Sequence, residues 1–387
     1  MREQIEGSQA IANAIACCRP EVVCAYPITP QTHIVEAVSR ISRAGKLGSC
    51  EVINVESEFA AMSVSIGASA AGARAYTATA SQGLLFMCEA LFNASGLGLP
   101  IVMTVANRAI GSPINIWNDQ SDSMAMRDSG WIQIYAVDNQ EAADLHVQAF
   151  KIAEQLSVPV MVCVDGFVLT HALEPVAVPT QEAVDEFLPP FEPRQVLDPA
   201  NPMTIGAMVG PEAFTEVRYL AHLQQLEALK VIPQVAAEFA EIFGRNAGGF
   251  LEGYRSDDAD TIVLALGSAN GTLAEVVDEL RADGVAVGSV ALKTYRPFPF
   301  EAVREALAGA KRVIVLERAF AVGIGGIVSA DVARAVAGLD IDLQTVIAGL
   351  GGRPITRRSL REMIEGELGE LTFLDLRTDV IEQELAV

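Results

Sequence analysis

The chain has 387 residues, of which 51% are hydrophobic, and its formal net charge at pH 7 is -22. The length predicts two or three domains with buried cores. The acidic charge argues against binding to nucleic acid or to an anionic membrane, because both need a basic protein surface. The sequence has no apolar run long enough to span a membrane, and its polar start MREQIEGSQA lacks the apolar segment of a signal peptide, so we expect a cytoplasmic protein.

The first predicted elements lead to a rigid turn. The apolar spacing predicts a helix over 7–18, a short buried strand over 21–26 and a helix that begins near Thr32, the expected N-cap. Between this strand and the second helix lies YPITP at 26–30, where two prolines restrict the backbone. Thr29 is therefore predicted to follow the end of a strand.

A strand–helix–strand–helix–strand pattern comes next, at residues 49–110, with polar residues at its turns. The three strands, at 50–55, 74–79 and 100–107, lead directly to Glu58, Ser81 and Arg108. In an open parallel sheet the carboxyl ends of the strands line one crevice, and ligands bind there. We therefore expect these three side chains to lie along a candidate site, close to Thr29.

The acidic candidate has a structural alternative. Glu58 starts an apolar helix that Ser57 can cap, and a glutamate in a first helical turn is common for electrostatic reasons alone. Glu56 is the rival acid, and the period of the strand places it on the opposite face. The pattern by itself leaves both interpretations of Glu58 open.

The basic candidate has an alternative as well. Arg108 follows an unbroken apolar strand and precedes a polar segment. A guanidinium in that position can hold a carboxylate through two parallel donors, or it can form a salt bridge with Asp119 or Asp122. The sequence around Arg108 does not decide between these two roles.

The rest of the chain predicts three parts. Residues 109–133 are polar and lack a period, which indicates a long loop. Strands at 131–137 and 158–166, with a helix between them, complete a doubly wound α/β domain over 1–172. Residues 173–260, first rich in proline and acid and then helical, are predicted to form a connecting arm. The renewed β–α order over 261–387 predicts a second α/β domain.

Several short motifs are assigned no chemistry. Gly323-Ile324-Gly325-Gly326 is not a GxGxxG motif and no Walker A lysine is present, so a tight turn is predicted there. The segment at 295–298 is predicted to be a packed turn between a strand and a helix. The six cysteines form no CxxC pair and the four histidines form no HExxH pair, so no metal site is predicted.

Several segments, in the same order along nearly the whole chain, carry a family resemblance. They are YPITPQT at 26–32, NVESEFAAMS at 54–63, TATASQGLLFM at 77–87, NRAIGSPINIWNDQSDSMAMRDSGWIQ at 107–133, DGF at 165–167 and TYRPFPFEAVREAL at 294–307. Together they resemble the alpha subunits of pyruvate:ferredoxin oxidoreductases (pyruvate synthases), which belong to the 2-oxoacid:ferredoxin oxidoreductase family.

The resemblance implies a fold and a reaction. It implies a doubly wound thiamine-diphosphate-type pyrimidine-binding domain, followed by a transketolase C-terminal-like α/β domain. The implied activity is the reversible oxidative decarboxylation of pyruvate with coenzyme A to acetyl-CoA and CO2, with reduction of ferredoxin. Glu58 matches the glutamate that contacts N1′ of the cofactor's aminopyrimidine. Thr29 and Arg108 match the residues that hold the pyruvate carboxylate, and Pro27, Ile28 and Thr29 are implied to lie beside the cofactor.

The resemblance also implies partner chains. This chain has no GDG motif for the Mg2+-diphosphate half of thiamine diphosphate and no cysteine cluster for [4Fe–4S] centres. The implied complex therefore contains a beta subunit with the diphosphate site, a gamma subunit, a ferredoxin-like delta subunit and ferredoxin as acceptor. The active site is expected at the interface with the beta subunit.

Two other functions stay open. The first is the equivalent subunit for another 2-oxoacid: 2-oxoglutarate, a branched-chain oxoacid or oxalate. A longer acid needs an extra cation, and Arg127 is the only further basic residue in the loop region. The second is a non-catalytic scaffold subunit, against which the joint presence of Glu58, Arg108 and Thr29 argues.

Overall fold

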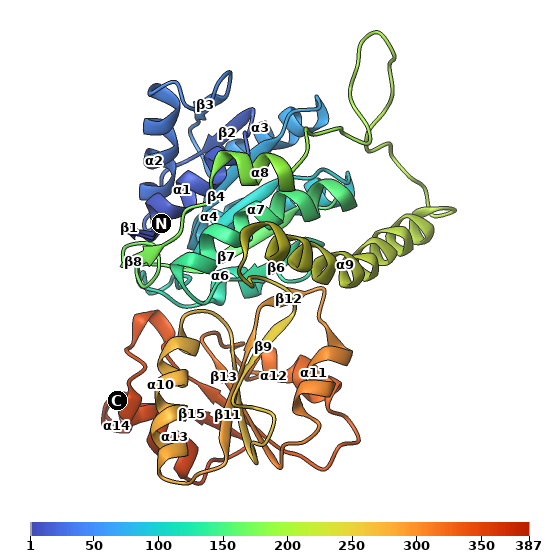
Figure 1. The fold of residues 1–387 in the computed structure, drawn as a ribbon. Helices are drawn as coiled ribbons and strands as arrows, with labels where there is room; N and C mark the ends of the chain where they lie inside the picture. The colour runs from blue at the N-terminus through green and yellow to red at the C-terminus, as the bar shows by residue number, and fades with distance from the viewer. Residues whose placement is uncertain (1, 387) are drawn as a thin grey trace.

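The computed structural model describes residues 2–386 and contains two α/β units joined by an arm (Figure 1). The first unit is built on a seven-stranded sheet in which six strands are parallel and one edge strand, β12, is antiparallel. Its strands, in spatial order, are β12 (Thr294–Arg296), β6 (Ile132–Tyr135), β7 (Val160–Asp165), β5 (Val102–Asn107), β4 (Ala75–Thr79), β2 (Val22–Ala25) and β3 (Glu51–Asn54).

Helices cover both faces of this sheet, as the sequence predicts for a doubly wound fold. Apolar residues of α1 (Gly7–Cys17), α2 (Thr32–Arg43) and α7 (Asn139–Leu156) form one buried core with the sheet. Those of α3 (Glu58–Ala70), α4 (Ser81–Phe86) and α5 (Cys88–Gly96) pack on the opposite face. The predicted α/β class with parallel sheets is confirmed.

The order of the strands places a topological switch point between β2 and β4. The two strands are neighbours, but α2, which follows β2, belongs to one face, whereas α4, which follows β4, belongs to the other. The connections thus diverge and leave a crevice at the carboxyl ends of these strands. The turn with Thr29 follows β2, and Ser81 opens α4 at the end of β4.

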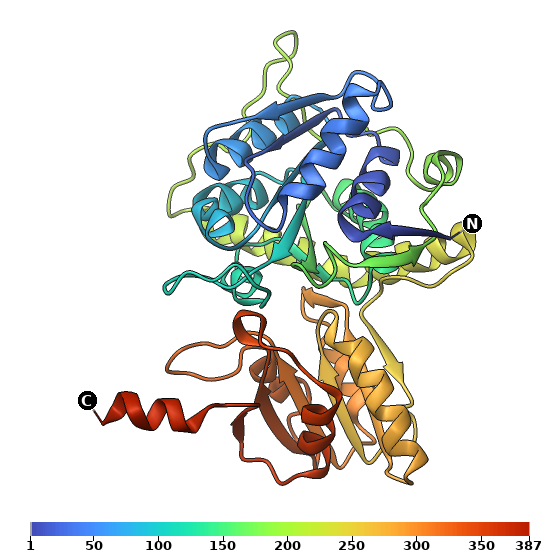
Figure 2. The same cartoon turned by 90° about the vertical axis from the view of Figure 1, so that its left-hand side faces the viewer.

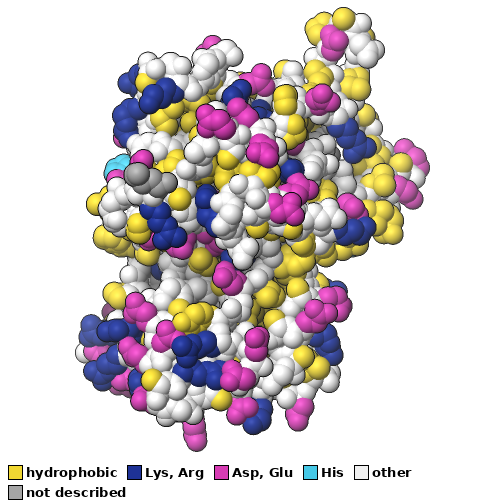
Figure 3. Space-filling model, in the orientation of Figure 1, with side chains coloured by type: hydrophobic (Ala, Val, Ile, Leu, Met, Phe, Trp, Pro, Cys, Tyr) yellow, Lys and Arg dark blue, Asp and Glu magenta, His cyan; other side chains and the backbone are white. Residues whose placement is uncertain are grey.

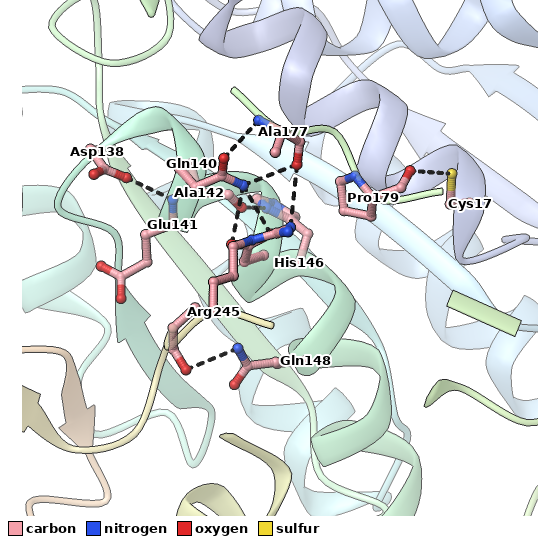
Figure 4. A network of polar contacts seen from close by, with 12 residues as sticks. Cys17, Asp138, Gln140, Glu141, Ala142, His146, Gln148, Ala177, Pro179 and Arg245 are labelled. Carbon is pink, nitrogen blue, oxygen red and sulfur yellow. Dashed lines mark hydrogen bonds and ion pairs between the residues drawn. The ribbon is translucent and has the colours of Figure 1, made fainter. Parts of the chain in front are cut away.

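The arm between the units lies against the first unit. It begins with β8 (Leu173–Val176), which pairs antiparallel with β1 (Glu3–Glu6), and continues through α8 (Gln181–Phe187) and the 30-residue helix α9 (Phe214–Phe243). Figure 4 shows polar contacts that tie it to α7: Gln140 Nε2 of this helix donates to the carbonyl of Ala177 over 3.1 Å. Arg245 Nη2, also in the arm, donates to the same carbonyl over 3.2 Å. Gln148 of α7 donates to the carbonyl of Ala247.

The second unit is built on a six-stranded sheet. Its strands, in spatial order, are β15 (Leu371–Phe373), β14 (Asp342–Ile347), β13 (Arg312–Glu317), β10 (Thr261–Ala265), β11 (Val287–Leu292) and the antiparallel edge strand β9 (Leu251–Tyr254). The helices α10 (Ala269–Ala282) and α13 (Arg357–Glu365) pack on one face, and α11 (Phe300–Leu307) and α12 (Val328–Ala335) on the other. The short helix α14 (Thr378–Leu385) has no buried residue.

The two units are more interwoven than the chain order predicts. Residues 294–296 form strand β12 of the first sheet and so include the first half of the segment 295–298, expected to be a packed turn, although the segments on either side belong to the second unit. In the other direction, β9 pairs with β11, so residues 251–254 join the second sheet. One apolar core extends across both units. We propose that the second unit begins at Leu251.

Two local predictions have different outcomes. Thr32 does not cap α2: the N-cap residue is Gln31, and its side chain donates instead to the carbonyl of Ala78 over 2.8 Å. The glycine segment at 323–326 is a turn, closed by a bridge between Ala321 and Gly325. The following helix, α12, has the carboxylate of Glu317 at its amino end, where it accepts three backbone N–H bonds. That carboxylate takes the position in which a phosphate would bind.

Candidate active site

Glu58 is a buried carboxylate at the amino end of α3. Ser57 caps the helix through its side chain, which accepts a bond from the backbone N–H of Ala60 over 3.2 Å. Glu58 is 8% exposed, and within residues 2–386 its carboxylate has no hydrogen-bond or ion-pair partner. The rival acid Glu56 is exposed. The side chain is largely buried and its carboxylate takes no bond from the described residues, so it is open to a donor from a ligand.

Because Gly83 has no side chain, the Glu58 carboxylate has space beside it. A Cβ atom added to Gly83 would lie 2.7 Å from Glu58 Oε1 and 2.6 Å from Thr79 Oγ1, both closer than van der Waals contact allows. The Thr79 hydroxyl is itself buried without a hydrogen-bond partner in the described chain. The end of β4 and the start of α3 therefore place a hydroxyl and a carboxylate side by side that take no bond from residues 2–386, which fits a polar group such as an aminopyrimidine.

Arg108 and Thr29 meet at the switch point. Arg108 Nη1 donates to the backbone carbonyl of Thr29, and Arg108 Nε donates to the carbonyl of Asn115, each over 2.9 Å. Burial lowers the pKa of Arg108 from its ordinary value, but an arginine remains charged at neutral pH. The predicted salt-bridge alternative is wrong within the described residues, because the guanidinium contacts neither Asp119 nor Asp122. Nη2 donates to no other group in residues 2–386 and can therefore bind a carboxylate.

Asp122 fixes the two strand ends between which the site lies. Its fully buried carboxylate accepts bonds from the backbone N–H groups of Ser81 (2.8 Å), Arg108 (3.0 Å) and Ser123 (2.8 Å), and from Nδ2 of Asn107 (2.8 Å). Burial raises the pKa of Asp122 to about 7, although these four bonds lower it. The carboxylate thus joins the end of β4 to the end of β5. The sequence indicated Asp122 only as a possible salt-bridge partner, and no spacing signal identifies this role.

The remaining predicted cofactor contacts lie in the turn after β2. Pro27 is exposed, whereas Ile28 is half-buried and packs on the core of the first unit. Thr29 is exposed, and its hydroxyl has no partner within the described chain. Gln31 anchors the turn to β4. The turn therefore presents Pro27 and Thr29 to solvent beside the crevice, where a second chain or a ligand can reach them.

The described residues supply only part of a cofactor site. Among them, no group of three or more His, Cys, Asp or Glu side chains could hold a metal ion. The atoms around Glu58 fit the pyrimidine ring of thiamine diphosphate, but none of the described groups fits its Mg2+-diphosphate half. In the part of the chain that the structure describes, no helix is long and apolar enough to cross a membrane.

The fold and this site define a subunit of the thiamine-diphosphate-binding α/β class. Residues 13–237 match the family model of the pyruvate flavodoxin/ferredoxin oxidoreductase thiamine diphosphate-binding domain, and residues 259–360 match core domain II of pyruvate:ferredoxin oxidoreductase. The chain belongs to the pyruvate:ferredoxin oxidoreductase family.

Relatives agree with this assignment. The pyruvate synthase subunit PorA of Methanosarcina barkeri is 46% identical over 97% of both chains, and the ketoisovalerate oxidoreductase subunit VorA of Pyrococcus horikoshii is 42% identical over 94% of this chain and 93% of that one. A 2-oxoglutarate:ferredoxin oxidoreductase from Magnetococcus marinus, solved with 2-oxoglutarate, coenzyme A and succinyl-CoA bound, has the same fold, with a TM-score of 0.72 at 22% identity. The similarity covers 94% of this chain and 65% of that chain, just under two thirds of its length.

Proposed function

We propose that this chain supplies the pyrimidine half of a thiamine diphosphate site, and that a beta subunit supplies the Mg2+-diphosphate half. The chain is the alpha subunit of a pyruvate:ferredoxin oxidoreductase, which converts pyruvate and coenzyme A to acetyl-CoA and CO2 and reduces ferredoxin. The observation that carries the split site is the buried, unpartnered carboxylate of Glu58 in the space beside Gly83. No second half of the site is found among the described residues.

Each candidate residue has a separate task in this proposal. When bound, thiamine diphosphate supplies the electron sink that decarboxylation of a 2-oxoacid requires. The Glu58 carboxylate holds a proton on the pyrimidine nitrogen that it contacts, in a site where burial strengthens the bond. Arg108 binds the substrate carboxylate through its free N–H groups, and the Thr29 hydroxyl adds a neutral donor. Pro27 and Ile28 shape the wall beside the cofactor.

Exposed apolar surface supports the assembly with other chains. The amino-terminal half of α9 carries large hydrophobic residues in solvent, among them Tyr219 (59% exposed) and Leu220 (60% exposed). Figure 3 shows hydrophobic side chains gathered on the flank where α9 and the preceding loop lie. Such patches mark protein interfaces. We assign the Mg2+ to the beta subunit, the [4Fe–4S] clusters to partner subunits that include a gamma and a ferredoxin-like delta chain, and the complex to the cytoplasm.

Calorimetry tests the division of the cofactor site. Titrating Mg2+-thiamine diphosphate into this chain alone should give no measurable heat of binding, whereas the same titration after addition of the beta subunit should give a saturable signal. The partner alone is the control, since it should bind more weakly than the pair. Tight binding by this chain without a partner would refute the split site.

A second candidate function is oxidation of a branched-chain 2-oxoacid. The observation that favours it is the 42% identity to a ketoisovalerate oxidoreductase subunit, close to the 46% for the pyruvate synthase subunit. The two candidate substrates differ in their side chains, but both have the carboxylate that Arg108 is proposed to bind. A panel of 2-oxoacids, assayed by viologen reduction with the assembled enzyme, separates the candidates: we expect the highest kcat/KM for pyruvate, and a higher value for 2-oxoisovalerate would favour the alternative.

A further inference from the structure

The guanidinium of Arg108 is held by a loop of its own unit. The loop over residues 109–120 follows β5, and the carbonyl of Asn115 accepts the bond from Arg108 Nε. Within the loop, the N–H of Ala109 donates to the carbonyl of Trp117 over 3.1 Å, and the N–H of Trp117 donates to Asn115 Oδ1 over 2.7 Å. These bonds restrain the carbonyl of Asn115, which is one of the two backbone acceptors of the Arg108 guanidinium.

The second unit holds the far side of this loop. Asn115 Nδ2 donates to the carbonyl of Gly351 over 3.1 Å, and the N–H of Gly351 donates to Asp119 Oδ2 over 3.0 Å. Next to them, the N–H of Gln120 donates to the carbonyl of Arg318 over 2.7 Å. Figure 2 shows the loop, in blue-green, projecting from the first unit beside the second. The loop is therefore bonded on one side to the substrate arginine and on the other to the turn at 349–352.

The turn at 349–352 is shaped to receive the loop. Gly351 has φ +58, and a Cβ atom there would lie 2.6 Å from Asn115 Nδ2. Gly352 has φ +81, and a Cβ atom there would lie 2.3 Å from Trp117 Cβ. A side chain at either position would thus collide with the loop in addition to straining the backbone. Asp119, which takes the bond from Gly351, is only 4% exposed.

We propose that the turn at 349–352 of the second unit orients Arg108 toward the substrate carboxylate through the loop at 109–120, with Asn115, Asp119 and Gly351 as positioning residues. The inference rests on the proposed role of Arg108 in binding that carboxylate. The physical reason is that a guanidinium binds a carboxylate bidentately only when its plane is aligned, and small misplacements in a site reduce the rate steeply. A loop without regular structure cannot fix that plane alone, so contacts from the second unit complete the substrate site.

The test compares two glycine substitutions in the second unit of the assembled enzyme. Gly351→Ala strains a positive φ and displaces Asn115, whereas Gly338→Ala strains a φ of +82 with nothing within 4 Å of the new Cβ atom. We expect Gly351→Ala to raise KM for pyruvate by about tenfold, the effect of one bond to a charged group. The apparent affinity for thiamine diphosphate should stay within about twofold, because the displaced loop affects only the binding of the substrate. Gly338→Ala should change neither quantity.

A readout without catalysis follows the loop itself. The chain has two tryptophans, and Trp117 is 52% exposed whereas Trp131 is 1% exposed. In this chain the part of the fluorescence that acrylamide quenches therefore comes from Trp117. Gly351→Ala should increase the quenching constant, and Gly338→Ala should leave it unchanged. To avoid signals from other subunits, the comparison is made as a difference between complexes that share the same partner chains.

A second variant covers the case in which Gly351→Ala fails to assemble. Asn115→Ala keeps the backbone carbonyl that contacts Arg108 but removes the side-chain amide, which donates to Gly351 and also accepts the N–H of Trp117. We expect it to raise KM for pyruvate by several-fold with unchanged thiamine diphosphate affinity.

If assembled Gly351→Ala and Asn115→Ala both keep a normal KM while Arg108→Lys raises it, the inference is overturned and the proposed function stands. If Arg108→Lys also keeps a normal KM, the proposed substrate role itself fails. A raised KM with equally weakened cofactor binding overturns the inference as well.

Discussion

Arg108 and Thr29 are bonded directly to each other: the guanidinium Nη1 donates to the Thr29 backbone carbonyl over 2.9 Å. The two residues follow β5 and β2, which are not neighbours, because β4 lies between them in the sheet. The arginine therefore reaches across the end of β4 to the switch point. The bond uses the carbonyl of Thr29 and leaves its hydroxyl free, so the contributions of the two residues can be measured separately.

Arg108→Lys should weaken binding of the substrate and not of the cofactor. Lysine keeps the charge but loses the planar fork, and it cannot donate to Thr29, Asn115 and a carboxylate in the geometry that arginine has. We expect kcat/KM for pyruvate to fall by about 10- to 100-fold, or ~1.5–3 kcal/mol, mainly through KM. Steady-state kinetics and a thiamine diphosphate titration check this. Weaker cofactor binding with an unchanged KM would assign Arg108 to the cofactor instead.

Thr29→Val should have a smaller effect than Arg108→Lys. Valine has nearly the shape of threonine and keeps the carbonyl that accepts the Arg108 bond, so the variant removes only the hydroxyl. Loss of a neutral donor costs about 0.5–1.5 kcal/mol, which corresponds to a fall in kcat/KM of roughly two- to tenfold. The same kinetics measure it, with Thr29→Ser as the control that retains a hydroxyl. An effect as large as that of Arg108→Lys would mean that Thr29 has a further role.

Gly83→Ala should remove activity although it replaces no acidic or basic residue. The added Cβ atom would lie 2.7 Å from Glu58 Oε1, so the carboxylate must move from its place. Overpacking of this kind costs about 1–3 kcal/mol of stability. Gly96→Ala is the matched control, because this glycine is also helical and has nothing within 4 Å of the new atom. Turnover and thermal unfolding of both variants are compared. Near-normal turnover of a folded Gly83→Ala enzyme would show that the position of Glu58 is unimportant.

Asp122 should make stability depend on pH in a defined direction. Its pKa of about 7 in the folded chain exceeds the value of about 4 for an unfolded aspartate, so the folded state binds the proton more tightly. The resulting stabilisation is complete below about pH 4 and is lost as the pH rises through 7. Asp122→Asn cannot titrate. Between pH 5.5 and 8.5 the wild type should therefore lose free energy of unfolding relative to the variant, as measured by denaturant titration. A constant difference would contradict the raised pKa.

Local patterns in the sequence predicted the elements and the strand ends, because each depends on neighbouring residues. The apolar runs gave the strands, and the polar residues after them gave Glu58, Ser81 and Arg108. The sequence could not predict contacts between distant segments. Asp122 receives its bonds from residues up to 41 positions away, and Gly351 contacts Asn115 over 236 positions. Strand β12 likewise joins a sheet whose other strands all precede residue 166.

Substitution of Glu58 tests the central claim most directly. In the assembled enzyme, pyruvate-dependent viologen reduction is measured for Glu58→Gln, which keeps the size of the side chain and removes the carboxylate, and for the exposed neighbour Glu56→Gln. Groups that handle protons contribute about 10²–10⁴-fold, so Glu58→Gln should lose activity by that factor with normal assembly, and Glu56→Gln should remain near the wild-type rate. Near-normal turnover of a correctly assembled Glu58→Gln enzyme would contradict the assignment of this chain as the pyrimidine half of the site.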